Sequence, residues 1–195
     1  MSHLGRKLYH VLGGAGLLAI WFALGRPRAF FAYAALLAAA LLFDAARFAL
    51  PRFNAWAMAN LRALLRAGEE RTFTGSPAYI AGVALALLIF PEPQAVAAVL
   101  FLAVGDVSAT AVGERWGRHR VGAKSLEGTA AFFAAACLAG LAARAALGGP
   151  PAGAVVAGAW CAALVELFLP KFANDNLVIP LVAALAMTLL SPGPA

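Results

Sequence analysis

The chain has 195 residues, of which 63% are hydrophobic and 12% are charged; its net charge is +6 and its mean hydropathy +0.84. This composition excludes an ordinary soluble domain, because apolar runs of membrane-spanning length recur along the chain. The positive charge does not indicate a nucleic-acid partner, since basic residues beside membrane spans orient membrane proteins. Cys137 and Cys161 lie inside apolar runs and are too few for a zinc site or a disulfide scaffold.

Seven apolar segments predict an all-α fold, a polytopic bundle of about seven transmembrane helices that forms one integral-membrane domain over residues 1–195. A long first run, followed by a second run after RPR, favours an uncleaved span over a signal peptide. The third run gives a helix of only about 22 Å, so a short or re-entrant helix is the alternative to a span across a core of about 30 Å. The predicted spans are residues 8–24, 29–48, 76–90, 94–113, 126–147, 153–170 and 176–191.

The basic residues predict the orientation of the chain. Twelve of the 15 Lys and Arg residues lie in alternate connections, and the other three are Arg26, Arg28 and Arg144. Because cytoplasmic connections carry the excess of Lys and Arg, we expect a cytoplasmic N-terminus, an external C-terminus and location in the cell (inner) membrane. The twelve are Arg6, Lys7, Arg47, Arg52, Arg62, Arg66, Arg71, Arg115, Arg118, Arg120, Lys124 and Lys171.

The connection between the second and third spans predicts a helix that lies in the headgroup region. In RFNAWAMANLRALLRAGEE, residues 52–70, apolar residues recur at helical spacing, and Arg62 and Arg66 lie one turn apart on another face. This pattern is typical of an amphipathic helix on a membrane surface. An ordinary connecting helix is the alternative. The apolar residues are Phe53, Trp56, Leu61, Leu64 and Leu65.

A dense cluster of charge, glycine and hydroxyl groups occupies residues 105–129. Asp106 lies in the apolar fourth span, where a carboxylate is costly unless it is paired or binds a cation. Thr110 and Gly113 follow it on the same helix face, and Gly117 continues that face. Such a face lets a ligand approach the backbone, although small residues also serve helix packing. Asp106 is therefore a candidate functional carboxylate, with a structural ion pair to a nearby Arg as the alternative.

The segment GRHRVGAKS, residues 117–125, predicts a phosphate site. It nearly matches the Walker A pattern, but an extra Ala precedes the lysine and no buried strand leads into it, so it is not a P-loop. Glycines, cations and hydroxyls still suit polyphosphate, and the helix that Ser125 opens offers free N–H groups to anions. The alternative is a loop whose Arg residues only set topology. The groups concerned are Arg118, Arg120, Lys124, Ser125, Glu127, Gly128 and Thr129.

Two further carboxylates lie far along the chain. In ALVELFLPKFANDNLVIPL, Glu166 lies within an apolar span and Asp175 opens the next one. Mg²⁺ binds one or two carboxylates and completes its shell with water and phosphate oxygens. We therefore expect Asp106, Glu166 and Asp175 to hold Mg²⁺ beside the basic loop. The alternative for Asp175 is a helix cap formed with Asn174.

Together these motifs resemble the CTP-dependent lipid kinases, namely dolichol kinase, phytol kinase and the fungal-type diacylglycerol kinase. Those families are similar in turn to the phosphatidate cytidylyltransferases. The similar stretches run in order along the whole chain, and the combination GD…GRH…KSLEGT is specific. Cytidylyltransferases end in a proline- and glycine-rich segment with an Asp–Arg pair, and its replacement here by NDNLVIP favours the kinase branch. The stretches are RKLYH, EERTFTG, GDVSATAVGERWGRHR, KSLEGT and NDNLVIP.

The resemblance implies roles for individual residues. Asp106 and Asp175 would be the catalytic carboxylates, and with Glu166 they would bind the metal. The implied nucleotide-binding residues are Gly113, Gly117, Arg118, Lys124, Ser125, Glu127, Gly128, Thr129 and Asn176. Possible additions come from the N-terminal motif and from the segment before the third span: Arg6, Lys7, His10, Glu70 and Arg71.

The activity that the resemblance implies is transfer of the γ-phosphate of CTP, with Mg²⁺, to a lipid alcohol at the cytoplasmic face. The alcohol would be a polyprenol or dolichol, phytol, or diacylglycerol. Partners would be a membrane lipid and a nucleotide, with no nucleic acid. One alternative is a phosphatidate cytidylyltransferase, which uses the same groups. A small transporter is the other, but transporters have ionisable residues near mid-membrane, whereas the polar groups here lie on one side.

Overall fold

The structure, a computed structural model, describes residues 3–61, 65, 69–170 and 173–191, with side chains from Tyr9 onward. Over these residues the fold is helical, apart from one two-stranded hairpin, which confirms the predicted all-α class. The elements in chain order are α1 (His3–Ala49), α2 (Pro51–Asn60), the 3₁₀-helix η1 (Glu69–Arg71), α3 (Gly75–Ile89), α4 (Glu92–Leu100), the π-helix η2 (Phe101–Gly105), α5 (Asp106–Trp116), β1 (Arg120–Val121), β2 (Lys124–Ser125), α6 (Leu126–Leu147), α7 (Ala152–Phe168) and α8 (Asp175–Leu189).

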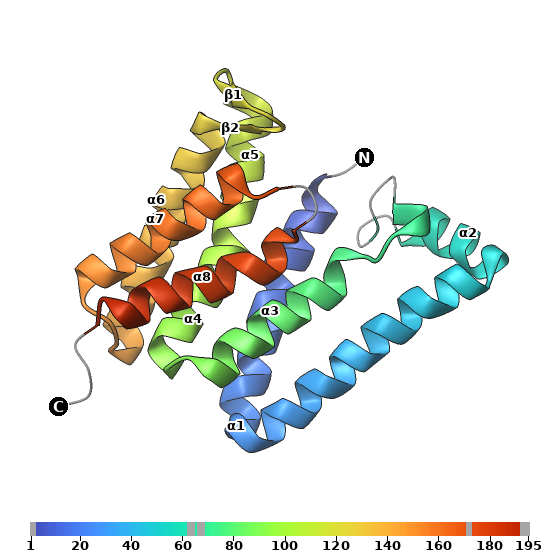
Figure 1. Cartoon of the computed structure of the whole chain (residues 1–195), viewed down its shortest axis with the longest axis horizontal. Coiled ribbons are helices and arrows are strands. Elements are labelled where there is room, and N and C mark those ends of the chain that lie inside the picture. The colour runs from blue at the N-terminus through green and yellow to red at the C-terminus, as the bar shows by residue number, and fades with distance from the viewer. Residues whose placement is uncertain (1–2, 62–64, 66–68, 171–172, 192–195) are drawn as a thin grey trace.

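The first two predicted spans form the two halves of α1. Gly25 interrupts the helical backbone with a φ of 71° and a ψ of 164°, a conformation that favours glycine. Pro27 follows inside the second half, where its fixed φ suits the first turn of a new helix. The chain therefore reverses direction at this bend, as Figure 1 shows at its lower edge.

The fourth predicted span forms the centre of the bundle as the continuous run α4–η2–α5. Its most apolar window is 56% buried, compared with 17% for the corresponding windows of α1 and α6. Phe101 and Leu102 in the π-helical turn are fully buried. A π-helical turn changes the direction in which the following side chains point and is frequent at functional sites. Here the turn ends immediately before Asp106.

Among the described residues, three helices are long and apolar enough to cross a membrane, namely Tyr9–Ala49, Glu92–Trp116 and Leu126–Leu147. The other apolar helices, α3, α7 and α8, have 15, 17 and 15 residues. At about 1.5 Å per residue these fall short of a core of about 30 Å. Three helices of spanning length are thus present among the described residues, and seven spans stay a prediction.

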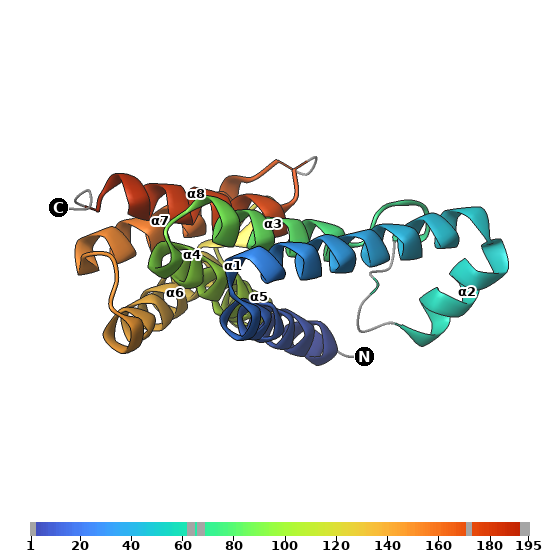
Figure 2. The same cartoon turned by 90° about the horizontal axis from the view of Figure 1, so that it is seen from below.

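The polar segments gather toward one edge of the bundle. In Figure 1 the β1–β2 hairpin lies at the top, with the starts of α1 and α8 below it and to its right, whereas the bend of α1 lies at the lower edge and the α3–α4 and α6–α7 connections lie toward the lower left. Figure 2 shows α3 and α8 side by side, above a layer that contains α5, α6 and the first half of α1. This layering brings the cytoplasmic ends predicted for several helices into one region.

The structure describes the predicted amphipathic helix only in its first part. It forms as α2 but ends at Asn60, whose side-chain amide donates to the Trp56 carbonyl at 2.8 Å. Residues 62–64 and 66–68, with Leu64, Arg62 and Arg66, lie outside the described residues. Within α2 only Ala57 is buried, while Trp56 is 52% exposed. Its position on the membrane surface stays a prediction.

Candidate active site

A polar cavity of about 280 Å³ opens where α5, the hairpin, α6, α7 and α8 converge. It brings together residues that are up to 69 positions apart in the sequence. Four carboxylates and two cations belong to its wall. The lining residues are Asp106, Ala109, Thr110, Gly113, Glu114, Arg120, Ala123, Lys124, Ser125, Gly128, Glu166 and Asp175.

Asp106 enters the cavity from the first turn of α5, directly after the π-helical turn. Its side chain is 19% exposed, and Oδ2 lies 3.7 Å from Nδ1 of His10 on α1. His10 is buried and packs edge-on against Tyr79, with ring centroids 5.1 Å apart. The Tyr79 hydroxyl donates to the His10 carbonyl at 2.7 Å, which fixes α1 to α3 behind the carboxylate. Asp106 is thus held from its buried side and open toward the cavity.

The hairpin places its lysine on the rim of the cavity. β1 and β2 pair antiparallel, with Val121 opposite Lys124, and Gly122 makes the turn with a φ of +60°. Ser125 ends β2 and caps α6, because its Oγ accepts from the Gly128 N–H at 3.1 Å. A Cβ on Gly117 would lie 2.6 Å from Ser125 Oγ, so only glycine lets α5 meet the hairpin here.

Lys124 joins two of the carboxylates. Its Nζ donates to Glu166 Oε1 at 2.7 Å and lies 3.7 Å from Asp175 Oδ2. Partial burial by itself lowers the pKa of Lys124, but the hydrogen bond to Glu166 and the nearby carboxylates outweigh it and raise that pKa above its usual value. Lys124 therefore stays protonated at neutral pH. The single hydroxyl proton of Thr129 is shared between the second oxygen of the buried Glu166 carboxylate, at 3.3 Å, and the Ser125 carbonyl, at 3.1 Å.

The structure places seven of the predicted site residues around the cavity and others behind its wall. The seven are Asp106, Gly113, Lys124, Ser125, Gly128, Glu166 and Asp175. Gly117 and Thr129 support the wall through Ser125 and Glu166. Asn176 is buried and its side chain donates to the Gly75 carbonyl at 3.4 Å.

Arg118 and Glu127 belong to the hairpin region but do not line the cavity. Glu127 accepts from Nδ1 of His119 at 2.7 Å and braces the entry to the hairpin. Glu70 and Arg71 line a separate cavity of about 640 Å³ beside α2. The side chains of Arg6 and Lys7 lie outside the described residues.

Glu114 is the charged residue of the cavity wall that the sequence did not identify as a candidate. It lies eight positions after Asp106 and four after Thr110, on the same helical face as both. That spacing is a signal that could have identified it. Arg120 was recognised only as one of three loop cations, because a loop sequence does not show which side chain turns inward.

The donor atoms around the cavity fit Mg²⁺ in part. No cluster of three or more His, Cys, Asp or Glu side chains suited to an ion occurs among the described residues. Mg²⁺ needs only one or two carboxylates when phosphate and water complete its shell. Asp106 and Asp175 are both partly exposed to the cavity and could serve in this way, whereas Glu166 is engaged by Lys124.

Comparison with known proteins supports the resemblance. No family model and no solved structure matches the chain. The chain is 36% identical over 76 residues to a curated protein named CTP-dependent diacylglycerol kinase 1, from Schizosaccharomyces pombe. The match covers 39% of this chain and 35% of the relative, so the chain spans about a third of that protein's length. Over these 76 residues the predicted similarity to a CTP-dependent lipid kinase is confirmed.

Proposed function

We propose that the protein is an integral-membrane lipid kinase that transfers the γ-phosphate of CTP to a lipid alcohol. The observation that carries this proposal is the cavity in which Lys124 and Arg120 face Asp106 and Asp175 at one end of an apolar helical bundle. Cations beside carboxylates suit a metal-bound polyphosphate. The similarity to a CTP-dependent diacylglycerol kinase supports CTP as the donor and diacylglycerol as one candidate acceptor.

The size of the cavity favours the triphosphate as the group bound within it. Sites that enclose a drug-sized molecule measure about 300–1,000 Å³, and this one has about 280 Å³. Its polar wall supplies cations, hydroxyl groups and the start of α6, where backbone N–H groups favour anions.

The reaction forms a bond between the lipid oxygen and the γ-phosphorus and breaks the bond from that phosphorus to its bridging oxygen, so that CDP leaves. Asp106 or Asp175 accepts the hydroxyl proton, and Lys124 and Arg120 hold the phosphates. Bound by Asp106 and Asp175, Mg²⁺ would offset negative charge on the phosphoryl group. The apolar helices would keep the lipid tail in the bilayer while its alcohol reaches the cavity.

Arg120 is expected to bind phosphate, and Arg118 provides a matched control on the same loop. Arg120 lines the cavity, with Nη2 3.4 Å from the Gly113 carbonyl, and Arg118 does not line it. A hydrogen bond to a charged group contributes about 1.5–3 kcal/mol, so Arg120→Gln should raise KM for CTP by about 10-fold or more. Arg118→Gln should change it by less than about threefold. Equal effects of the two substitutions on KM would contradict this assignment.

The cavity is expected to face the cytoplasm, because the hairpin that forms part of its wall belongs to a connection rich in Lys and Arg. In a background in which Cys137 and Cys161 are replaced by Ala, cysteines at Arg118 and Asn174 should resist an impermeant thiol reagent in intact cells. A cysteine at Gly149 should be labelled. All three should react after permeabilisation, and labelling of position 118 in intact cells would reverse the orientation.

The nucleotide requirement tests the proposed donor. Purified protein with Mg²⁺ and a lipid alcohol should form a lipid monophosphate, detected by mass spectrometry, when CTP is supplied. ATP, GTP and UTP should each support at most a small fraction of that rate. Equal rates with ATP and CTP would show that CTP is not the specific donor, although the protein would still be a lipid kinase.

A further inference from the structure

A fully buried ion pair lies outside the candidate active site, in the last turns of α1. Asp44 and Arg47 have side chains that are 0% exposed, with Oδ1 and Nη2 2.9 Å apart. Burial of two charges is costly unless further hydrogen bonds satisfy the remaining donors and acceptors. The surroundings of this pair therefore show what it holds in place.

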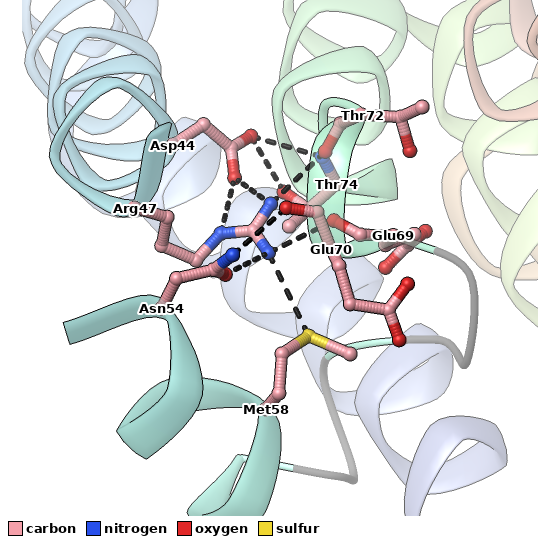
Figure 3. A network of polar contacts seen from close by, with 8 residues as sticks. All are labelled: Asp44, Arg47, Asn54, Met58, Glu69, Glu70, Thr72 and Thr74. Atoms are coloured by element: carbon pink, nitrogen blue, oxygen red, sulfur yellow. Dashed lines mark hydrogen bonds and ion pairs between the residues drawn. The ribbon is translucent and has the colours of Figure 1, made fainter. Parts of the chain in front are cut away.

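Arg47 holds the segment that leads from α2 to α3. Its guanidinium donates to Asp44 and also to the backbone carbonyls of Glu69 and Thr72, each at 3.0 Å (Figure 3). Asn54 of α2 accepts from Arg47 at 3.3 Å and donates to the Glu70 carbonyl at 2.8 Å. The EERTFTG segment thus contributes backbone carbonyls to this network. Through them, Arg47 ties residues 69–72 to the end of α1.

Asp44 extends the network to the start of α3. Its second oxygen accepts from the backbone N–H of Thr74 at 2.9 Å and from the Thr74 hydroxyl at 3.0 Å, as Figure 3 shows. Thr74 is the residue before α3, and its side chain makes no capping bond to that helix. The hydroxyl is instead committed to Asp44. The first residue of α3 therefore has its position set by a carboxylate on α1.

The start of α3 in turn contacts the start of α8, which carries Asp175. The Gly75 carbonyl accepts from the Asn176 side-chain amide at 3.4 Å. Further along α3, a Cβ on Gly82 would lie only 2.3 Å from the Asn176 carbonyl, so the two helices touch through their backbones. Because Asn176 follows Asp175 directly, a shift of α3 would move the Asp175 carboxylate relative to Lys124.

We propose that Asp44, Arg47 and Thr74 are positioning residues for the candidate active site and act on Asp175 through α3 and Asn176. This inference rests on the proposed function. Apolar side chains of similar volume could stabilise the same corner equally well. Directional hydrogen bonds to Thr74, however, fix where α3 begins. Displacement of a reacting group by about 1 Å can reduce the rate by about 100-fold, so a small shift of α8 has a large effect on turnover.

The test uses substitutions that spare the buried charges. Thr74→Val removes the hydroxyl donor but keeps the size of the side chain and the backbone N–H, and Thr74→Ser restores the hydroxyl. Asn54→Ala is the matched control, since it removes two hydrogen bonds of the same network on the α2 side and leaves the Asp44–Thr74 contacts in place. Each variant is purified in detergent, and its melting temperature, kcat and KM for CTP are measured.

We expect Thr74→Val to lower kcat by about 10-fold or more. This is less than the loss of about 100-fold that follows when a reacting group is displaced by about 1 Å. Thr74→Ser should retain kcat within about threefold of the parent protein. Asn54→Ala should lower the melting temperature at least as much as Thr74→Val while retaining kcat. If kcat instead falls in both variants in proportion to the fall in melting temperature, the network has a purely structural role and the inference is overturned.

Hydrogen–deuterium exchange separates this inference from the proposed function, because it does not require activity. Thr74→Val should accelerate amide exchange in the first two turns of α8, and Asn54→Ala should not. A parent protein that phosphorylates no lipid, with faster α8 exchange in Thr74→Val, would overturn the proposed function and retain the link to α8. An active parent whose Thr74→Val variant shows unchanged kcat and exchange would overturn the inference alone.

Discussion

Asp106→Asn is expected to abolish turnover while the protein still folds and inserts. The substitution preserves the size of the side chain and removes a charge from a partly buried position, so it lowers the desolvation cost of the fold. It also removes the negative charge that would bind the metal or accept the hydroxyl proton. Loss of such transition-state stabilisation is equivalent to about 3–4 kcal/mol, or at least about 100-fold in kcat.

The measurement is kcat with CTP and a lipid alcohol, beside the melting temperature in detergent. Glu92→Gln serves as the control, because it neutralises a carboxylate at the other end of the bundle, where Glu92 accepts from the Trp21 indole at 2.8 Å. The control should keep kcat within about threefold of the parent, since it touches no group in the cavity. Near-normal turnover in Asp106→Asn would remove Asp106 from the reaction.

Lys124→Met is expected to lose both activity and stability, and the two losses should separate in a double variant. The ammonium is the proposed phosphate ligand, so its removal should lower kcat/KM for CTP by at least about 100-fold. The substitution also leaves Glu166, whose side chain is 3% exposed, without its cation. Because the Lys124 side chain is 38% exposed and water reaches this pair, we expect a loss of only about 1–3 kcal/mol in unfolding free energy.

The double variant Lys124→Met with Glu166→Gln neutralises the carboxylate that loses its cation in Lys124→Met. It should regain most of the lost stability, since an uncharged amide can still accept from the Thr129 hydroxyl. It should regain no activity, because the phosphate ligand is still missing. Recovery of turnover in the double variant would show that Lys124 only neutralises Glu166, and the phosphate-binding role would then be wrong.

The helices were predictable because apolar runs and helix-ending residues are local signals. The bend was visible in the sequence as a break between two apolar runs, but the sequence pattern alone did not identify Gly25 as the residue whose backbone leaves the helical conformation. Contacts such as Lys124 with Glu166 join residues 42 positions apart. The order of the predicted spans could indicate that Lys124 and Glu166 lie near the same membrane face. The contact between them, and the position of Arg120 in the cavity wall, depend on the tertiary structure.

Asp44 shows a signal that was present and not used. It lies inside the second apolar run, where a carboxylate is as costly as it is at Asp106. Arg47, one turn later, was counted only as a topological charge. Their spacing of three residues is typical of a helical ion pair, so the pair itself could have been expected. Its link to Thr74, 30 positions away, could not.

The most direct test of the central claim is to follow which phosphorus of CTP reaches the lipid. Purified protein receives CTP labelled either at the γ- or at the α-phosphorus, together with Mg²⁺ and, in turn, polyprenol, phytol, diacylglycerol or phosphatidate. A kinase joins the lipid oxygen to the γ-phosphorus and releases CDP, so we predict γ-label in the lipid with at least one alcohol and no labelled product from phosphatidate. Transfer of α-label to phosphatidate with release of pyrophosphate would contradict the kinase and establish a cytidylyltransferase, and no transfer to any acceptor by folded protein would contradict both.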